Sequence, residues 1–301
     1  MLWIKTIFNK ITLNKWRYIC WIIGFVMFVA PFALLTRLIY FLIGNIAEPD
    51  LHSICFRMPF DWIFSGRFFY IFQYPVMFGT IIIAIIVALF FGPLFCGWIC
   101  PIGSISEALS RIIPLPNRFR IQIKDTNITK SLRYGFLTGW IIVSLLIGLG
   151  YAGVSSICCR YCAVSVLQDD IIKFLLGELV YWHSGSLIVL IFWLIIGGIF
   201  TIGGRGWCIL FCPLGAVSGL VHSIGARLGF YRTIRTNKKC NNCNKCIEVC
   251  PMWAIDDDNK SIARTLCINC YECIKRCPNG VFSMVKGKQS GGINDNAIKN
   301  T

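Results

Sequence analysis

Long apolar stretches separated by short polar segments dominate the first two thirds of the chain. A helix needs about 20 apolar residues to cross the hydrocarbon core of a bilayer. Four stretches come close to that length and predict transmembrane helices: Tyr18 to Ile43, Val76 to Phe95, Tyr134 to Val154 and Leu187 to Ile202. Pro31 and Arg37 interrupt the first stretch, so we expect a kink or a tilt there. No small-residue cleavage site accompanies it, which favours a retained helix over a signal peptide.

The composition agrees with this pattern. Of the 301 residues, 56% are hydrophobic and only 14% are charged, and the mean hydropathy is +0.67. These values are typical of a membrane protein rather than of a soluble domain. The net charge is +15, but the basic residues flank the apolar stretches, so they do not indicate a nucleic-acid partner.

The distribution of Lys and Arg predicts a topology. Four lie before the first apolar stretch, two in the first loop, six in the second connection, two in the third loop and fourteen after the fourth stretch. By the positive-inside rule, both termini and the segment 96–133 are cytoplasmic, and the loops 44–75 and 155–186 lie outside. The sequence therefore predicts a multi-pass protein of the bacterial cytoplasmic (inner) membrane.

The polar segment after about Asn237 contains the same cysteine run twice. Each run reads Cys-x2-Cys-x2-Cys-x3-Cys-Pro. In bacterial ferredoxins three thiolates of such a run bind one 4Fe–4S cluster, and the fourth binds the other cluster. A zinc ribbon needs only two cysteine pairs with a longer spacer. The runs predict one cluster at Cys240, Cys243, Cys246 and Cys277, and a second at Cys267, Cys270, Cys273 and Cys250.

A second cysteine pattern ends the second and fourth apolar stretches. The two Cys-x3-Cys-Pro elements are 112 positions apart, and their similarity continues into the following residues, which indicates an internal repeat. Cysteines at i and i+4 share one face of a helix. The thiols could serve one redox or metal centre, serve two separate sites, or pack as apolar groups, and spacing alone does not decide. They are Cys96, Cys100, Cys208 and Cys212.

Two further groups lie in the loops that the charge count places outside. Cys55, Cys158, Cys159 and Cys162 suit disulfides or simple packing, and alternatively a metal or redox site on the outer face. His52, Arg57 and Asp61 lie among aromatic residues, a mixture that suits a quinone headgroup but also an interfacial aromatic belt. No Walker loop, dinucleotide fingerprint or haem-attachment motif is present, which argues against a pump driven by ATP, a flavin or nicotinamide enzyme and a c-type cytochrome.

Together these patterns predict an α-helical membrane protein with a C-terminal α+β ferredoxin-like domain that holds two 4Fe–4S clusters. The four transmembrane helices would form two repeated two-helix units. The predicted boundaries are 1–17 for a cytoplasmic segment, 18–235 for the membrane domain, 236–285 for the ferredoxin domain and 286–301 for a disordered tail.

This combination of motifs resembles the NapH family from about Lys15 to Met284, and it is similar to the C-terminal part of NosR and to CcoG. The resemblance implies an electron-transfer subunit of a quinol dehydrogenase. Electrons would pass from the membrane quinone pool, with an iron–sulfur partner called NapG, toward the periplasmic nitrate reductase. It also implies that the metal ligands are the eight cysteines of the two runs and the four thiols of the Cys-x3-Cys-Pro elements. The cluster at Cys158, Cys159 and Cys162 is not part of the family pattern.

Three other functions compete with this interpretation. One is a CcoG-like metal-handling or assembly factor for a respiratory enzyme, and another is a membrane anchor whose clusters only hold a partner. A transporter fits worst, because charged residues within the apolar stretches are nearly absent apart from Arg37.

Overall fold

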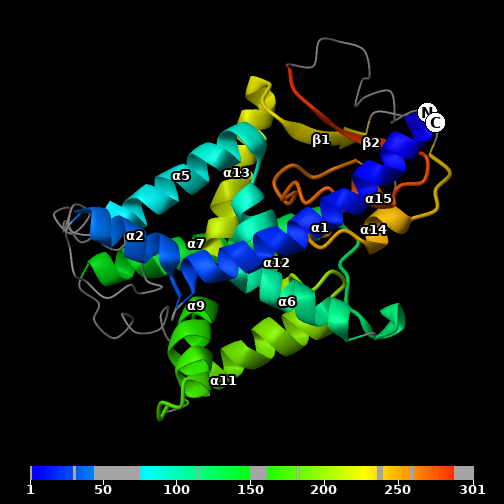
Figure 1. Cartoon of the computed structure of the whole chain (residues 1–301). Helices are drawn as coiled ribbons and strands as arrows, with labels where there is room; N and C mark the ends of the chain where they lie inside the picture. Colours follow the sequence, from blue (N-terminus) through cyan, green and yellow to red (C-terminus); the bar gives the residue numbers. More distant parts are fainter. Residues whose placement is uncertain are drawn as a thin grey trace.

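The structure of the protein is a computed structural model. It describes residues 2–29, 32–43, 75–113, 115–149, 161–180, 182, 184–235, 240–257 and 261–287. A helical part, built from segments between residues 2 and 228, packs against a smaller C-terminal part that contains a short sheet (Figure 1).

Long helices and short, partly π-helical segments alternate in the helical part. The longer helices are α1 (Leu2–Phe28), α2 (Leu34–Ile43), α5 (Pro75–Phe91), α6 (Pro101–Ile112), α7 (Thr126–Gly148) and α13 (Pro213–Leu228). The shorter ones are η2 (Phe95–Ile99), η3 (Asn117–Phe119), α9 (Ala163–Ser165), η5 (Val166–Ile172), α10 (Lys173–Leu175), α11 (Ser184–Leu190), η6 (Ile191–Ile199) and α12 (Gly206–Leu210).

The apolar stretches form helices, but not the transmembrane helices that the sequence predicts. In the described part of the chain no helix combines the length and the hydropathy that a membrane crossing requires. The first stretch is divided between α1 and α2, the second forms α5 with 17 residues, and the fourth is divided between α11 and η6. The predictions of four transmembrane helices and of a multi-pass inner-membrane protein are therefore wrong.

Charged side chains lie in the interior of the helical part, while many large apolar side chains lie outside. Phe41 and Leu42 of α2 are 81% and 73% exposed, whereas Arg17, Glu107 and Arg205 are at most 3% exposed. A buried charge needs an opposite charge and hydrogen bonds. The interior of this part is thus joined by polar contacts as well as by apolar packing.

An apolar core connects α6, η5 and η6. Trp193 of η6 is completely buried in it, next to Val166, Leu167 and Ile102. Because a buried indole N–H needs an acceptor, the Nε1 atom of Trp193 donates to the Ile102 carbonyl at 3.1 Å. This hydrogen bond joins η6 to the first turn of α6.

The C-terminal part consists of β1 (Arg232–Arg235), α14 (Lys245–Glu248), α15 (Glu272–Arg276) and β2 (Phe282–Val285). Helix α13 ends at Gly229, whose φ of 97° is the left-handed conformation that glycine adopts at low cost. The chain then enters β1, which pairs antiparallel with β2 so that Arg232 faces Val285 and Arg235 faces Phe282. The sheet therefore lies directly beyond the end of α13 (Figure 1).

Close backbone contacts hold the C-terminal part against the helical part. A methyl group on Gly97 would lie 2.6 Å from the Ile268 carbonyl oxygen, and one on Gly219 would overlap the Thr265 carbonyl. Two indoles also cross the boundary: Trp98 Nε1 donates to the Asn269 carbonyl at 3.1 Å, and Trp253 Nε1 donates to the Ile202 carbonyl at 2.9 Å. These contacts bring the two sets of cysteines described below into one region of the molecule.

Candidate functional site

The two cysteine runs of the C-terminal part adopt the same local conformation. The residue before the second cysteine is left-handed in both runs, with φ of 53° at Asn242 and 48° at Asn269. The residue after it is left-handed too, with φ of 54° at Asn244 and 61° at Tyr271. Asparagine tolerates this region better than most residues do. Each run is consequently a tight loop, and the two loops are structural copies.

The repeat extends to the fourth cysteine of each run. The third residue after it is left-handed in both cases, with φ of 50° at Trp253 and 60° at Gly280. Cys250 Sγ accepts a hydrogen bond from the backbone N–H of Ala254 at 3.3 Å, and Cys277 Sγ accepts one from Val281 at 3.4 Å. Hydrogen bonds to the sulfur atoms are a common feature of iron–sulfur ligands, whose potentials they influence.

The four thiols predicted to bind the second cluster line one pocket. Cys267, Cys270 and Cys273 of the second run meet Cys250 of the first run there. The pocket wall also includes apolar residues, among them Ile255 and Ile268. Four thiols from two runs around an apolar pocket fit a 4Fe–4S cluster, which takes four thiolate ligands.

Burial dominates the protonation of these thiols. Burial, with a smaller contribution from the neighbouring Cys270, raises the pKa of Cys250 to about 12. The pKa values of Cys267, Cys270 and Cys273 are raised as well, chiefly by burial. Because metal ligation requires thiolates, binding of a cluster would release protons from this pocket.

The other predicted set is less compact. Cys246 and Cys277 are buried in the core of the C-terminal part, and Cys240 packs against that core. Cys243 is exposed. The structure thus places three of these four cysteines at one apolar core and the fourth at the surface.

The two Cys-x3-Cys-Pro elements also have the same construction. Cys96 lies in η2 and Cys208 in α12, each within a short helical segment. Cys100 and Cys212 then occupy the N-cap positions of α6 and α13, and a proline follows each as the first helical residue. Proline is favoured there because an N–H group at the first helical position has no acceptor within the helix.

The four thiols of these elements lie close to one another. Burial, together with the neighbouring Cys100, raises the pKa of Cys96 to about 11. Burial, together with Cys96 and Cys100, raises the pKa of Cys212 to about 12. Burial also raises the pKa of Cys208, partly opposed by Arg205, and the other three thiols raise it further. Two elements that are far apart in sequence therefore bring their thiols within electrostatic reach of one another, and each of the four is partly buried.

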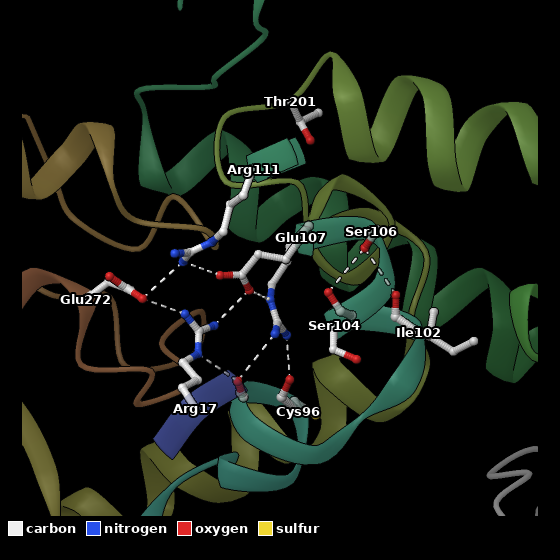
Figure 2. A network of polar contacts seen from close by, with 12 residues as sticks. Arg17, Cys96, Ile102, Ser104, Ser106, Glu107, Arg111, Thr201 and Glu272 are labelled. Carbon is white, nitrogen blue, oxygen red and sulfur yellow. Dashed lines mark hydrogen bonds and ion pairs between the residues drawn. The ribbon is translucent and has the colours of Figure 1, made fainter. Parts of the chain in front are cut away.

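A buried network of charges surrounds the first element (Figure 2). The Glu107 carboxylate accepts from Arg17 Nη2 at 2.7 Å, Arg205 Nε at 2.6 Å and Arg111 Nη2 at 2.6 Å. Burial raises the pKa of Glu107, but the three guanidinium groups outweigh it and lower the value to about 2. Glu107 is therefore ionised, and it compensates guanidinium groups that burial would otherwise destabilise.

The same network reaches both sets of cysteines. Arg205 Nη1 donates to the Cys96 carbonyl, and Arg17 Nε donates to the Gly97 carbonyl at 3.2 Å. Arg17 Nη1 also forms an ion pair with Glu272 at 2.8 Å, and Glu272 lies between the second and third cysteines of the second run. Sequence reasoning missed this network. Its one visible signal is that Glu107 is the sole charged residue between positions 96 and 110.

Several predicted residues lie outside the described part of the chain, namely Cys55, Cys158, Cys159, His52, Arg57 and Asp61. The same holds for most of the predicted tail, from 288 onward. Cys162 is described: it is half-buried, immediately precedes α9 and forms no disulfide. Among the described residues, no three His, Cys, Asp or Glu side chains form the close group that a single metal ion would need.

Two family models match the chain. One, described as a 4Fe-4S binding domain, matches twice, at residues 73–121 and 186–230. Each match contains one Cys-x3-Cys-Pro element. The other, described as a 4Fe-4S dicluster domain, matches residues 239–282, which contain both ferredoxin runs. The chain is thus a ferredoxin-type protein with 4Fe–4S binding domains.

Curated relatives carry similar descriptions. The "Ferredoxin-type protein NapH" of Haemophilus influenzae is 30% identical over 177 residues, which cover 57% of this chain and 53% of that protein. NapH of Escherichia coli is 29% identical over 58% of this chain and 52% of its own length. The "Methylamine utilization ferredoxin-type protein MauN" of Methylobacillus flagellatus is 28% identical over 58% of this chain and 53% of its own length. The chain thus spans about half the length of these relatives, and no solved structure matches it.

Proposed function

We propose that the chain passes electrons from a quinol to an iron–sulfur partner of a reductase, because it is similar to ferredoxin-type proteins such as NapH and MauN. The nitrate reductase system is the acceptor that fits best, since two of the relatives are NapH proteins. The partner would be a NapG-like iron–sulfur protein.

The observation that carries the proposal is the pocket where Cys250 joins Cys267, Cys270 and Cys273. These residues would hold a 4Fe–4S cluster, and Cys240, Cys243, Cys246 and Cys277 would hold the other. Such clusters accept and release one electron at a time. Apolar residues such as Ile255 and Ile268 line the pocket beside the thiols.

The overall reaction balances for a quinol donor. A quinol loses two electrons and two protons when it becomes a quinone. Two one-electron carriers can take up the electrons, and the protons pass to solvent. Two electrons and two protons convert nitrate into nitrite and water at the reductase.

The buried charge network gives the second run a fixed position. Glu272 forms ion pairs with Arg17 at 2.8 Å and Arg111 at 3.0 Å. Both arginines also form ion pairs with Glu107 of α6. The loop between Cys270 and Cys273 is thereby tied to the helix that follows Cys100. This arrangement supports electron transfer because a fixed distance between carriers needs rigid supports.

The test is reduction of the full chain by a quinol. The anaerobically purified holoprotein is mixed with a menaquinol analogue while cluster signals are followed by EPR. We expect signals to appear on quinol addition, and a Cys270→Ser variant to lose the signal of the second cluster. Cys20→Ser is the matched control, because Cys20 is a half-buried thiol of α1 outside every motif.

Two outcomes would contradict the proposal. Clusters that dithionite reduces and quinol does not would favour the metal-handling or assembly alternative. Electron delivery that fails with a nitrate reductase system, but succeeds with a methylamine-utilisation partner, would reject the nitrate link and retain the electron-transfer role.

A further inference from the structure

The two sets of ferredoxin thiols differ in their exposure to solvent. Cys243 belongs to the first set and is exposed. None of the thiols of the second set, Cys250, Cys267, Cys270 and Cys273, is exposed. Electron transfer between two proteins becomes slower as the distance between their redox centres grows, so a cluster with a ligand at the surface is the better one to serve a second protein.

The loop that supplies most of the second set lies against the helical part. A methyl group on Gly97 would lie 2.6 Å from the Ile268 carbonyl oxygen, and Trp98 Nε1 donates to the Asn269 carbonyl at 3.1 Å. The rings of Trp98 and Tyr271 also meet, with centroids 6.0 Å apart. The helical part therefore covers this loop and keeps other proteins away from that side of it. The second set is the inner one, and the first set is the outer one.

Residues from both runs lie beside the outer set. The residues on each side of Cys243 are exposed. Cys277, which belongs to the same predicted set, directly follows α15, and residues 278–280 after it are exposed as well. Helix α14 packs against α15 (Figure 1). We call the surface formed by residues 241–245 and 275–280 the outer-cluster face.

The outer-cluster face is basic. The two cysteine runs contain three basic residues, Lys245, Lys275 and Arg276, and two acidic ones, Glu248 and Glu272. Glu272 is buried within the charge network described above (Figure 2), which leaves Glu248 as the exposed carboxylate of the two runs. Lys245 and Arg276 are exposed, and neither forms an ion pair within the described part of the chain. A surface with this excess of positive charge attracts an acidic protein.

We propose that the outer-cluster face is the docking site of an acidic electron-transfer protein, and that electrons leave the chain from the set that contains Cys243. The inference rests on the proposed function, because it takes electron transfer by the two ferredoxin clusters as its premise. Each transfer moves one electron and no proton: the acceptor gains the electron that the chain loses. Attraction between opposite charges raises the rate of association, and electron-transfer complexes need only small, transient interfaces.

The test compares two one-electron acceptors of opposite charge. An acidic plastocyanin accepts an electron at Cu(II), and a basic cytochrome c accepts one at Fe(III). The holoprotein is reduced with dithionite, freed of excess reductant and mixed with each acceptor in an anaerobic stopped-flow instrument. The rate with plastocyanin should fall as the ionic strength rises, because salt screens the attraction, and the rate with cytochrome c should rise. The opposite salt dependence would overturn the proposal.

Charge-reversed variants locate the docking site. Lys245→Glu plus Arg276→Glu should slow the reaction with plastocyanin about tenfold and accelerate the reaction with cytochrome c. The matched control is Arg37→Glu plus Lys173→Glu, which changes the net charge equally at exposed residues of α2 and α10. The control should keep both rates close to the wild-type values. Equal effects in the two variants would assign the steering to total charge and overturn the proposal, and so would unchanged rates in both.

A binding measurement tests docking without electron transfer. The affinity of the holoprotein for redox-inactive, zinc-substituted plastocyanin should fall about tenfold in the outer-cluster variant and stay unchanged in the control. A faster reaction with cytochrome c would also show that the outer-cluster variant is folded. Equal affinity in the two variants would overturn the proposal. None of these measurements uses quinol, so a negative result here leaves the proposed donor untouched, and failure of quinol to reduce the clusters leaves the docking result standing.

Discussion

Arg205 Nε donates a hydrogen bond to Glu107 Oε2 at 2.6 Å, and the two residues are 98 positions apart in sequence. Their side chains are 1% and 0% exposed. Arg17 binds the same carboxylate oxygen at 2.7 Å. One buried carboxylate thus compensates guanidinium groups from two distant segments, and this joins α1 and the start of α12 to α6.

Replacing Glu107 by glutamine should destabilise the protein strongly. Glutamine has a similar shape but no charge, so Arg205 would remain buried without its carboxylate partner, and Arg17 would keep only its ion pair with Glu272. Breaking a buried ion pair in this way costs about 3–5 kcal/mol. Thermal unfolding of the anaerobically purified chain measures the effect.

The matched control for that variant is Lys124→Gln. Lys124 Nζ and Asp257 Oδ2 are 3.9 Å apart, with side chains 75% and 36% exposed. An exposed pair contributes at most about 1 kcal/mol, so this variant should unfold close to the wild-type temperature. Equal stability of the two variants would show that the buried network does not stabilise the fold.

The difference between these two pairs also shows what sequence reasoning could and could not reach. Spacing within a cysteine run is local, so the pattern names Cys250 and the second run as partners, and the structure brings those four thiols to one pocket. A pairing across 98 positions leaves no local pattern, so the sequence does not identify Glu107 and Arg205 as partners.

The apolar stretches show the opposite limitation. Average hydropathy identified helices between Tyr18 and Ile43, but it does not detect where a helix ends. Helix α1 stops at Phe28 and α2 starts at Leu34. Hydropathy likewise does not reveal which charged side chains are buried. Arg133 is one of them, and its Nη1 atom donates to the carbonyl of Thr265. The predicted length of an apolar run was therefore not the length of a helix.

Stability should decrease as the pH falls from 7 to 5 because of His222. Burial, with smaller contributions from Arg264 and Arg232, lowers the pKa of His222 on α13 from 6.5 to about 4. The unfolded chain therefore binds a proton between these two values while the folded protein does not. The stability that this residue contributes is complete above pH 6.5 and is lost as the pH falls toward 4.

The expected loss between pH 7 and pH 5 is about 2 kcal/mol. Unfolding temperatures at both pH values, for the wild type and for His222→Gln, measure it. The variant should show the smaller decrease because glutamine does not titrate. A decrease of the same size in both proteins would assign the pH dependence to other groups.

Gly219→Ala should weaken the packing of the C-terminal part against α13. A methyl group there would overlap the backbone carbonyl of Thr265, and backbone cannot rotate away as a flexible side chain can. We expect a loss of about 1–3 kcal/mol, as in other overpacked interiors, together with faster proteolysis between β1 and β2. Gly135→Ala is the control, because a methyl group on Gly135 of α7 would have no neighbour within 4 Å. That change should be neutral or stabilising by up to about 1 kcal/mol, and a similar response of both variants would show that the contact at Thr265 is not specific.

Asn269 and Asn242 occupy equivalent positions in the two cysteine runs, and comparing them isolates the hydrogen bonds of one residue. Both are left-handed, with φ of 48° and 53°, so alanine imposes a similar backbone cost at each. Asn269 is 1% exposed; its Nδ2 donates to the Phe91 carbonyl at 2.7 Å, and its Oδ1 accepts from Thr233 Oγ1 at 3.0 Å. Asn242 is exposed.

Asn269→Ala should therefore cost about 2–4 kcal/mol more than Asn242→Ala, since it leaves two buried polar groups without their partners. It should also accelerate loss of the second cluster, because the loop between Cys267 and Cys270 would lose its connection to α5 and β1. Unfolding temperatures and the decay of cluster absorbance under a chelator measure the two effects. Equal decay in both variants would mean that Asn269 does not hold the loop, and that the left-handed backbone alone determines its conformation.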